Sequence, residues 1–119
     1  MRQINDKHGE NMKLITKAIE KKLPAFYATE EVALQEKNLV VKFFTPDAQW
    51  TWYGVEYDKK SETFFGYAIG NTYCGDFAGG GEWGYFSIDE LKKAKGQFGL
   101  GVERDMSFRE TKFKNLKEA

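Results

Sequence analysis

The chain has 119 residues, of which 30% are charged, and equal numbers of acidic and basic side chains give a formal net charge of zero. This length fits one domain with a single core, and the neutral balance gives no global attraction to nucleic acid or to an anionic membrane. No apolar run approaches the ~18 residues of a membrane span. The single cysteine excludes an intramolecular disulfide and fits the reducing cytoplasm, where we expect the protein.

Residues 1–11 are polar and without periodicity, and we expect them to form a flexible extension. Apolar residues at helical spacing then predict an amphipathic helix over 13–23, which Pro24 ends. A connector over 25–37 follows.

The remainder of the chain is dominated by segments rich in strand-forming residues. They predict strands over 38–44, 50–57, 63–70, 82–86 and 102–108. Between the last two strands, Ser87 and Glu90 form a capping box that begins a helix over 88–95, with Gly96 as its expected end. The basic tail, residues 110–119, is expected to fray after Arg109.

These elements predict a single α+β domain over 12–109, with an antiparallel sheet of four to five strands and two helices on one face. Strand alternation in 50–57 places Trp50 and Trp52 on one face of the sheet. The other face receives Thr51, Tyr53, Val55 and Tyr57. Both faces are apolar, which predicts a sheet covered on part of its second side.

No catalytic signature is found in the sequence. The only histidine, His8, lies in the predicted flexible extension, where it is not positioned for proton transfer or zinc binding. Cys74 has acidic neighbours that oppose thiolate formation. The glycine-rich segment 75–84 lacks the lysine of a phosphate-binding loop and leads into a strand, which favours a hairpin connection. We therefore expect no catalytic residue, no metal site and no cofactor.

Carboxylates cluster near two predicted strand ends, where Glu56 and Asp58 would meet Glu103 and Asp105 if those ends lie together. Such a cluster would suit a hard metal ion and a small metal-dependent hydrolase or nuclease. Arg104 lies on the same strand face as apolar residues, which favours a structural ion pair for its guanidinium.

Aromatic side chains are the main candidates for binding. The chain carries 10 Phe, 6 Tyr and 3 Trp, more than a small core requires. Core packing is the alternative role for these rings, since burial of each contributes about 1.5–3 kcal/mol. We expect one exposed aromatic cluster that includes Trp50 or Trp52. The candidate binding residues are Trp50, Trp52, Tyr53, Tyr67 and Arg104.

Several sequence strings occur together in a fixed order. They are LITK with LP near the first helix, VKFFTPD, WTWY, FFGY, GYFS with EL, and GL followed by VERD. Over residues 12–109 the chain resembles a small bacterial family of unknown function that is found on conjugative and other mobile elements. The resemblance implies a cytoplasmic bacterial protein and no catalytic residue, and the chain departs from the family pattern at 71–83.

The leading hypothesis is a non-catalytic module that binds a protein partner through exposed aromatic side chains, as an accessory to DNA transfer or defence evasion. One alternative is a nucleic-acid-binding protein that stacks bases on an aromatic sheet face. The other is the metal-dependent hydrolase. Enzymatic activity is not expected, no membrane association is expected, and the sequence leaves the oligomeric state open.

Overall fold

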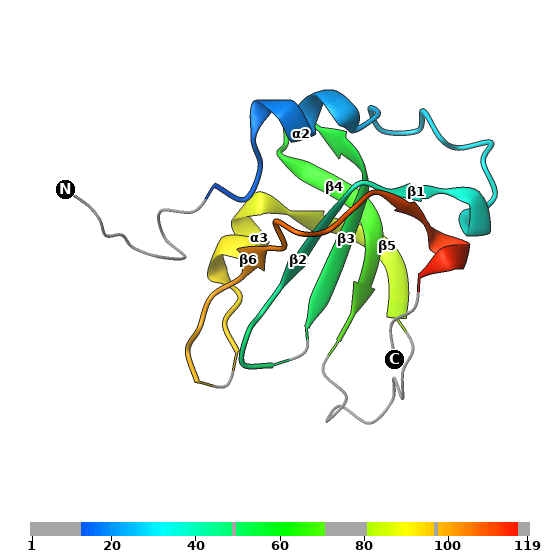
Figure 1. The fold of residues 1–119 in the computed structure, drawn as a ribbon. Helices are drawn as coiled ribbons and strands as arrows, with labels where there is room; N and C mark the ends of the chain where they lie inside the picture. Colours follow the sequence, from blue (N-terminus) through cyan, green and yellow to red (C-terminus); the bar gives the residue numbers. More distant parts are fainter. Residues whose placement is uncertain (1–12, 49, 71–80, 97, 117–119) are drawn as a thin grey trace.

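The central element of the structure is an antiparallel sheet of five strands in the order β5-β4-β3-β2-β6 (Figure 1). The computed structural model describes residues 13–48, 50–70, 81–96 and 98–116. The strands of this sheet are β2 (Val41–Phe44), β3 (Thr51–Asp58), β4 (Thr63–Ile69), β5 (Gly81–Ser87) and β6 (Glu103–Arg104). A second sheet pairs β1 (Asn38–Leu39) with β7 (Thr111–Lys112). The predicted α+β fold with an antiparallel sheet is confirmed.

In the described residues two α-helices accompany the sheet, α2 (Lys17–Lys22) and α3 (Ile88–Lys93). Helix α2 is shorter than the predicted 13–23 because the Thr16 hydroxyl accepts the N–H of Ile19 and so begins the helix there. The capping box of Ser87 and Glu90 begins α3 as predicted. Within the described residues, no helix is both long and apolar enough to cross a membrane.

Helix α3 ends at Lys93, with Ala94 as its C-cap, before the predicted end at Gly96, because Lys95 forms a β-bridge with Gly101. Gly96 instead lies against Asp47: a Cβ added to this glycine would come within 1.6 Å of the Asp47 carboxylate. That carboxylate accepts the backbone N–H groups of Phe98 and Leu100 at 2.7 and 3.2 Å. Gly96 is thus required for close approach to Asp47.

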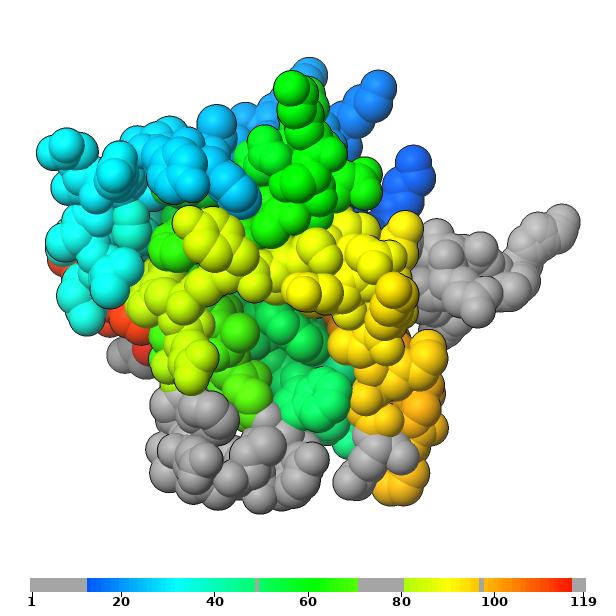
Figure 2. Space-filling view, turned by 180° about the vertical axis from the view of Figure 1, so that it is seen from behind, coloured from blue at the N-terminus to red at the C-terminus, as the bar shows by residue number. Residues whose placement is uncertain are grey.

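Both helices contribute to the core on one side of the sheet, here called the helical face, which agrees with the predicted placement. The buried residues of this face come from the sheet, from α3 and from segments outside the regular elements, including those on either side of α2. They are Leu14, Leu23, Val41, Phe43, Tyr57, Phe64, Phe86, Ile88, Leu91 and Val102. Viewed from behind, the yellow α3 segment lies in the foreground (Figure 2).

The opposite side, here called the connector face, has its own core around the fully buried Leu39, Tyr53 and Val55. The C-terminal segment crosses in front of the sheet and packs Phe113 onto this cluster (Figure 1). The structure therefore differs from the predicted frayed tail: β7 pairs with β1, and a 3-10 helix, η4 (Phe113–Asn115), follows. The tail is held in place because its apolar side chains, Phe113 and Leu116, pack against the core of the connector face.

The predicted strand over 38–44 is divided between the two sheets. Residues of β1 pair with β7, whereas β2 pairs with β3 and β6. A 3-10 helix, η2 (Leu34–Glu36), precedes β1. The division places Leu39 in the core of the connector face and Phe43 in that of the helical face.

Strand β3 does not alternate regularly along its length. Its register with β4 shifts between Gly54 and Glu56, which marks a β-bulge. As a result Tyr57 packs in the core of the helical face, whereas Tyr53 packs in the core of the connector face. The prediction that these two tyrosines share a face is wrong, because simple alternation does not account for the extra residue of a bulge.

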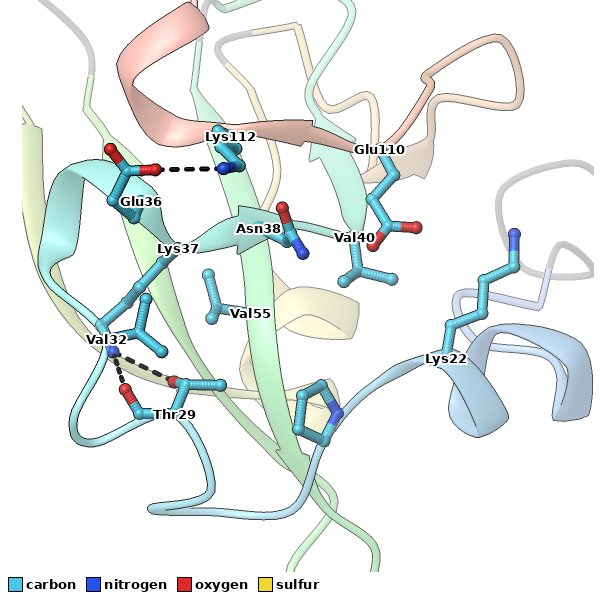
Figure 3. A pocket seen from close by; sticks show the side chains of 11 residues that line it. Lys22, Thr29, Val32, Glu36, Lys37, Asn38, Val40, Val55, Glu110 and Lys112 are labelled. Atoms are coloured by element: carbon cyan, nitrogen blue, oxygen red, sulfur yellow. Dashed lines mark hydrogen bonds and ion pairs between the residues drawn. The ribbon is translucent and has the colours of Figure 1, made fainter.

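A buried carboxylate fixes the connector to the sheet. Glu56 in β3 accepts the N–H of Tyr27 at 2.8 Å and that of Thr29 at 3.0 Å, and it also accepts the Thr29 hydroxyl. The buried Lys37 ammonium donates to the Thr29 carbonyl at 2.5 Å and to its hydroxyl at 3.0 Å, as Figure 3 shows. This network satisfies polar groups that would otherwise be buried at a high cost.

Gly66 and Gly84 are cross-strand partners, but only Gly84 has space for a side chain, so substitutions at the two positions provide a matched test of the sheet. A Cβ on Gly66 would lie 1.8 Å from the backbone oxygen of Tyr53, whereas one on Gly84 would meet nothing within 4 Å. We expect Gly66→Ala to lower the free energy of unfolding by about 3 kcal/mol. Gly84→Ala should change it by less than about 1 kcal/mol. Urea denaturation measures both, and equal losses would contradict the close approach at Gly66.

Replacing Glu56 by Gln tests the attachment of the connector. The amide keeps one acceptor oxygen but presents N–H groups where Thr29 donates, so we expect the free energy of unfolding to fall by about 2 kcal/mol. The control is Glu31→Gln, because Glu31 is exposed on the same connector. Urea denaturation that finds equal stability for both variants would show that the Glu56 carboxylate does not hold the connector.

Candidate binding surface

The structure divides the five sequence-predicted binding residues between the two faces of the sheet. Phe43 pairs with Trp52 in β3 and with Arg104 in β6, so these three side chains share the helical face. Trp50 joins them through an edge-to-face contact with Trp52, with ring centroids 6.5 Å apart. Both tryptophans are half-buried, and Arg104 donates to the carbonyl of Lys13.

Tyr53 and Tyr67 lie on the connector face and are engaged in its core. Tyr53 is fully buried, with its ring 5.7 Å from that of Phe108. Tyr67 is half-buried between Trp83 and Phe113, at centroid distances of 5.3 and 4.7 Å. These two tyrosines therefore stabilise the attachment of the C-terminal segment, and Tyr53 has no surface to offer a partner.

The most exposed tyrosines of the described residues are not among these five. Tyr27 in the connector is 65% exposed and Tyr85 in β5 is 57% exposed. The ring of Phe26 connects them, at centroid distances of 5.9 Å to Tyr27 and 5.3 Å to Tyr85. Together with two half-buried neighbours they form what we call the aromatic surface. Its members are Phe26, Tyr27, Phe65, Trp83 and Tyr85.

The aromatic surface rests on contacts that restrict its movement. Phe65 in β4 packs against both Trp83 and Tyr85, at centroid distances of 5.7 and 5.3 Å. Tyr27 adopts a left-handed backbone conformation with φ of 71°, which its N–H bond to Glu56 helps to hold. Pro24 adds a second attachment, since its carbonyl accepts the N–H of Tyr57 at 2.9 Å.

The two exposed tyrosines also influence each other electrostatically. The pKa of Tyr85 is raised above its usual value. The main cause is partial desolvation of its hydroxyl, and the second is the proximity of Tyr27. The hydroxyl is therefore neutral at physiological pH, and it can both donate and accept hydrogen bonds. The surface offers ring faces and tyrosine hydroxyl groups, which suits binding better than proton transfer.

Acidic side chains follow the aromatic surface along the connector. The N–H of Glu30 bonds to the carbonyl of Tyr27 at 3.2 Å, so the backbone of this exposed glutamate lies next to that of Tyr27. Glu31 is also exposed. A partner that covers Tyr27 thus meets a negatively charged border, which favours basic side chains on the partner.

A groove of about 340 Å³ lies on the other side of the connector, between it and the segments of β1 and β7 (Figure 3). Its floor is apolar and includes Pro24, Val40 and Val55. Some of the charged groups on its walls have protein partners: Lys37 bonds to Thr29, and Lys112 pairs with Glu36 at 3.0 Å. The other two charged side chains of the lining, Lys22 and Glu110, have opposite signs. The lining therefore gives little indication of a specific ligand.

The predicted carboxylate cluster is not assembled among the described residues, in which no group of three or more His, Cys, Asp or Glu side chains could hold a metal ion. Glu56 is committed to the connector. Asp58 accepts the hydroxyl and the N–H of Ser61, and these bonds hold its pKa below the usual value. Asp105 pairs with Lys42 at 3.7 Å. Each of these carboxylates thus has a local structural partner.

Some of the sequence expectations concern residues outside the described ranges. They are the extension 1–11 with His8, Cys74 with the glycine-rich residues 75–80, and the end of the tail at 117–119. Residues 81–84 of the glycine-rich segment belong to β5.

Sequence reasoning missed Phe26, Tyr27 and Tyr85 as parts of a surface. For Tyr85 a signal was present, since alternation in 82–86 places it with Trp83, opposite the buried Phe86. For Phe26 and Tyr27 no periodic signal exists, because they lie in irregular chain after Pro24.

Comparison with known proteins gives one match. Searches of curated proteins and of solved structures found no similar protein. A family model matches residues 14–115, which is most of the chain and extends from the segment before α2 to the end of η4. The chain therefore belongs to the family described as "Protein of unknown function (DUF2958)".

Proposed function

We propose that this protein is a non-catalytic interaction module whose aromatic surface binds a protein partner. The observation that carries the proposal is the pairing of two tyrosines that are 65% and 57% exposed, Tyr27 and Tyr85, on a base of packed aromatic rings. Tyrosine is enriched at the energetic centres of protein interfaces, because it combines a large apolar area with a polar group. Little entropy is lost when such restrained side chains bind.

The charges near the surface favour a protein partner over nucleic acid. Platforms that stack single-stranded bases combine aromatic rings with basic residues that contact phosphate. Here the exposed charged residues that follow Tyr27 in the connector are Glu30 and Glu31, and the nearby Lys37 ammonium is buried and bonded to Thr29. We infer a partner segment with apolar and basic side chains. The proposed setting, carried over from the family resemblance, is the bacterial cytoplasm, on a mobile element and accessory to DNA transfer or defence evasion.

Site-specific photo-crosslinking tests the proposed surface. With p-benzoylphenylalanine in place of Tyr27, cells that naturally carry the protein should yield one crosslinked product of defined mass. The same probe in place of Phe98, which is 76% exposed in another part of the chain, should not yield it. Tyr85→Ala should lower the yield through position 27 by about tenfold, as expected for loss of an interface tyrosine.

Met106→Ala is the matched control for Tyr85→Ala, because Met106 is 72% exposed and lies outside the aromatic surface. It should leave the crosslink unchanged. Equal products at positions 27 and 98, or a yield that Tyr85→Ala does not change, would count against the proposed surface.

A fluorescence titration with single- and double-stranded oligonucleotides separates this proposal from the nucleic-acid alternative. At low salt, where phosphate contacts are strongest, we expect no saturable binding at tens of micromolar protein. Binding that weakens steeply with added salt and disappears in Tyr27→Ala would replace the protein partner with nucleic acid.

A further inference from the structure

Strand β5 forms one edge of the main sheet, and no other strand in the described part of the chain pairs with its outer side. The direction of its backbone groups follows from one hydrogen bond: Ile88 donates its N–H to the carbonyl of Glu62 at 2.9 Å. Antiparallel ladders alternate between residues that bond to the neighbour and residues that point away. Gly84 and Phe86 therefore bond to β4, while the N–H and C=O groups of Trp83 and Tyr85 point outward.

The capping box agrees with this assignment. The N–H of Ser87, two residues after Tyr85, bonds to the Glu90 side chain at 3.1 Å and is not used by β4. The outward groups of Trp83 and Tyr85 thus form an unpaired segment of ladder. Such a segment matches the backbone of another extended strand.

The β5 edge lacks the features that normally prevent pairing between edges. Proteins shield edge strands with proline, lysine, bulges or short length. The seven residues of β5 pair with β4 without a register shift, and their only charged side chain is that of Glu82. At the opposite edge, β6 has two residues, both charged, Glu103 and Arg104. The two edges of the same sheet therefore differ in their capacity to accept a strand.

We propose that β5 pairs with β5 of a second copy of this chain, antiparallel about a two-fold axis at Gly84. In this register Trp83 lies opposite Tyr85 of the second copy, and Tyr85 lies opposite its Trp83. Both residues carry outward backbone groups, so each pair exchanges two hydrogen bonds. A two-fold interface of this kind uses the same surface on both subunits.

Side chains fit the same register. At the axis, glycine meets glycine in a non-hydrogen-bonded pair, where backbones approach most closely, and a Cβ added at Gly84 would meet nothing within 4 Å of its own chain. Tyr85 and Trp83 form cross-strand aromatic pairs on either side of the axis. Glu82 lies opposite Phe86 of the second copy, so carboxylates do not oppose each other.

Two other registers near this one are less favourable. Centring the axis on Tyr85 would require the Ser87 N–H, which Glu90 already holds. Centring it on Glu82 would place two carboxylates opposite each other, which is destabilising. The zero formal net charge of the chain adds no overall repulsion between copies.

The pairing would also have a consequence for binding, and this consequence rests on the proposed function of the aromatic surface. A two-fold axis perpendicular to the sheet joins the two sheets into one and places both aromatic surfaces on the same side of it. A partner with two binding segments would then gain affinity from simultaneous attachment.

The test uses disulfide trapping in a Cys74→Ser background, which removes the only native cysteine. In the proposed register Gly84→Cys places two thiols opposite each other at a separation that a disulfide can span. Oxidation should convert this variant to a covalent dimer. The control, Glu82→Cys, should form no covalent dimer, because its symmetry mate lies four residues away along the strand.

Analytical ultracentrifugation provides the second measurement. The wild-type chain should sediment as a dimer, Gly84→Ala should dimerise equally well, and Gly84→Asp should dimerise about fivefold more weakly because two carboxylates meet at the axis. A wild-type chain that is monomeric at hundreds of micromolar, or cysteines that crosslink equally at positions 82 and 84, would overturn the inference. A monomer that still crosslinks to a partner through Tyr27 would leave the proposed function standing.

Discussion

A sheet with apolar side chains on both faces needs two covers, and in this protein only one of them is helical. The helices satisfy their own backbone groups. The connector over 25–37 bonds some of its N–H groups to its own carbonyls, but those of Tyr27 and Thr29 need a partner elsewhere. The Glu56 carboxylate is that partner, since it accepts N–H groups from Tyr27 and Thr29 while itself buried in β3. One buried acid therefore helps to hold the connector on an apolar sheet, and the bulge next to Gly54 directs Glu56 to that side.

The position of the aromatic surface follows from this attachment. One of the two residues whose N–H groups bond to Glu56 is Tyr27, so a contact that anchors the connector also directs an exposed ring beside β5. Phe26 then packs its ring against Tyr85, which couples the connector to the edge of the sheet. A ring held in this way keeps most of its area exposed and has little freedom left to lose on binding. This combination distinguishes the aromatic surface from Trp50 and Trp52, which are half-buried on the helical face.

Local sequence signals predicted the fold class, the main strands and the capping box of α3, because each depends on residues close together in the chain. Three features depend on distant residues and were missed. The β3 bulge reverses the face of Tyr57, the lysine-rich tail docks through Phe113, and a turn of irregular chain brings Phe26 to Tyr85. The aromatic content of β3 and β4 favoured these strands as the binding site, but they are central strands and are covered on both faces. The exposed tyrosine rings lie on the edge strand and the connector, and their exposure depends on tertiary packing, which local sequence periodicity does not predict.

The contrast between the two sheet edges bears on what this fold presents to other molecules. At β6 the edge is short and charged, and Arg104 bonds to the carbonyl of Lys13, so the chain itself occupies part of that side. At β5 the ladder is longer, regular and almost uncharged, and its outward residues, Trp83 and Tyr85, also belong to the aromatic surface. A strand added at this edge would use their backbone groups, while a partner on the connector face would use their rings. Because backbone and side chain point in perpendicular directions in a strand, the two contacts can be occupied together.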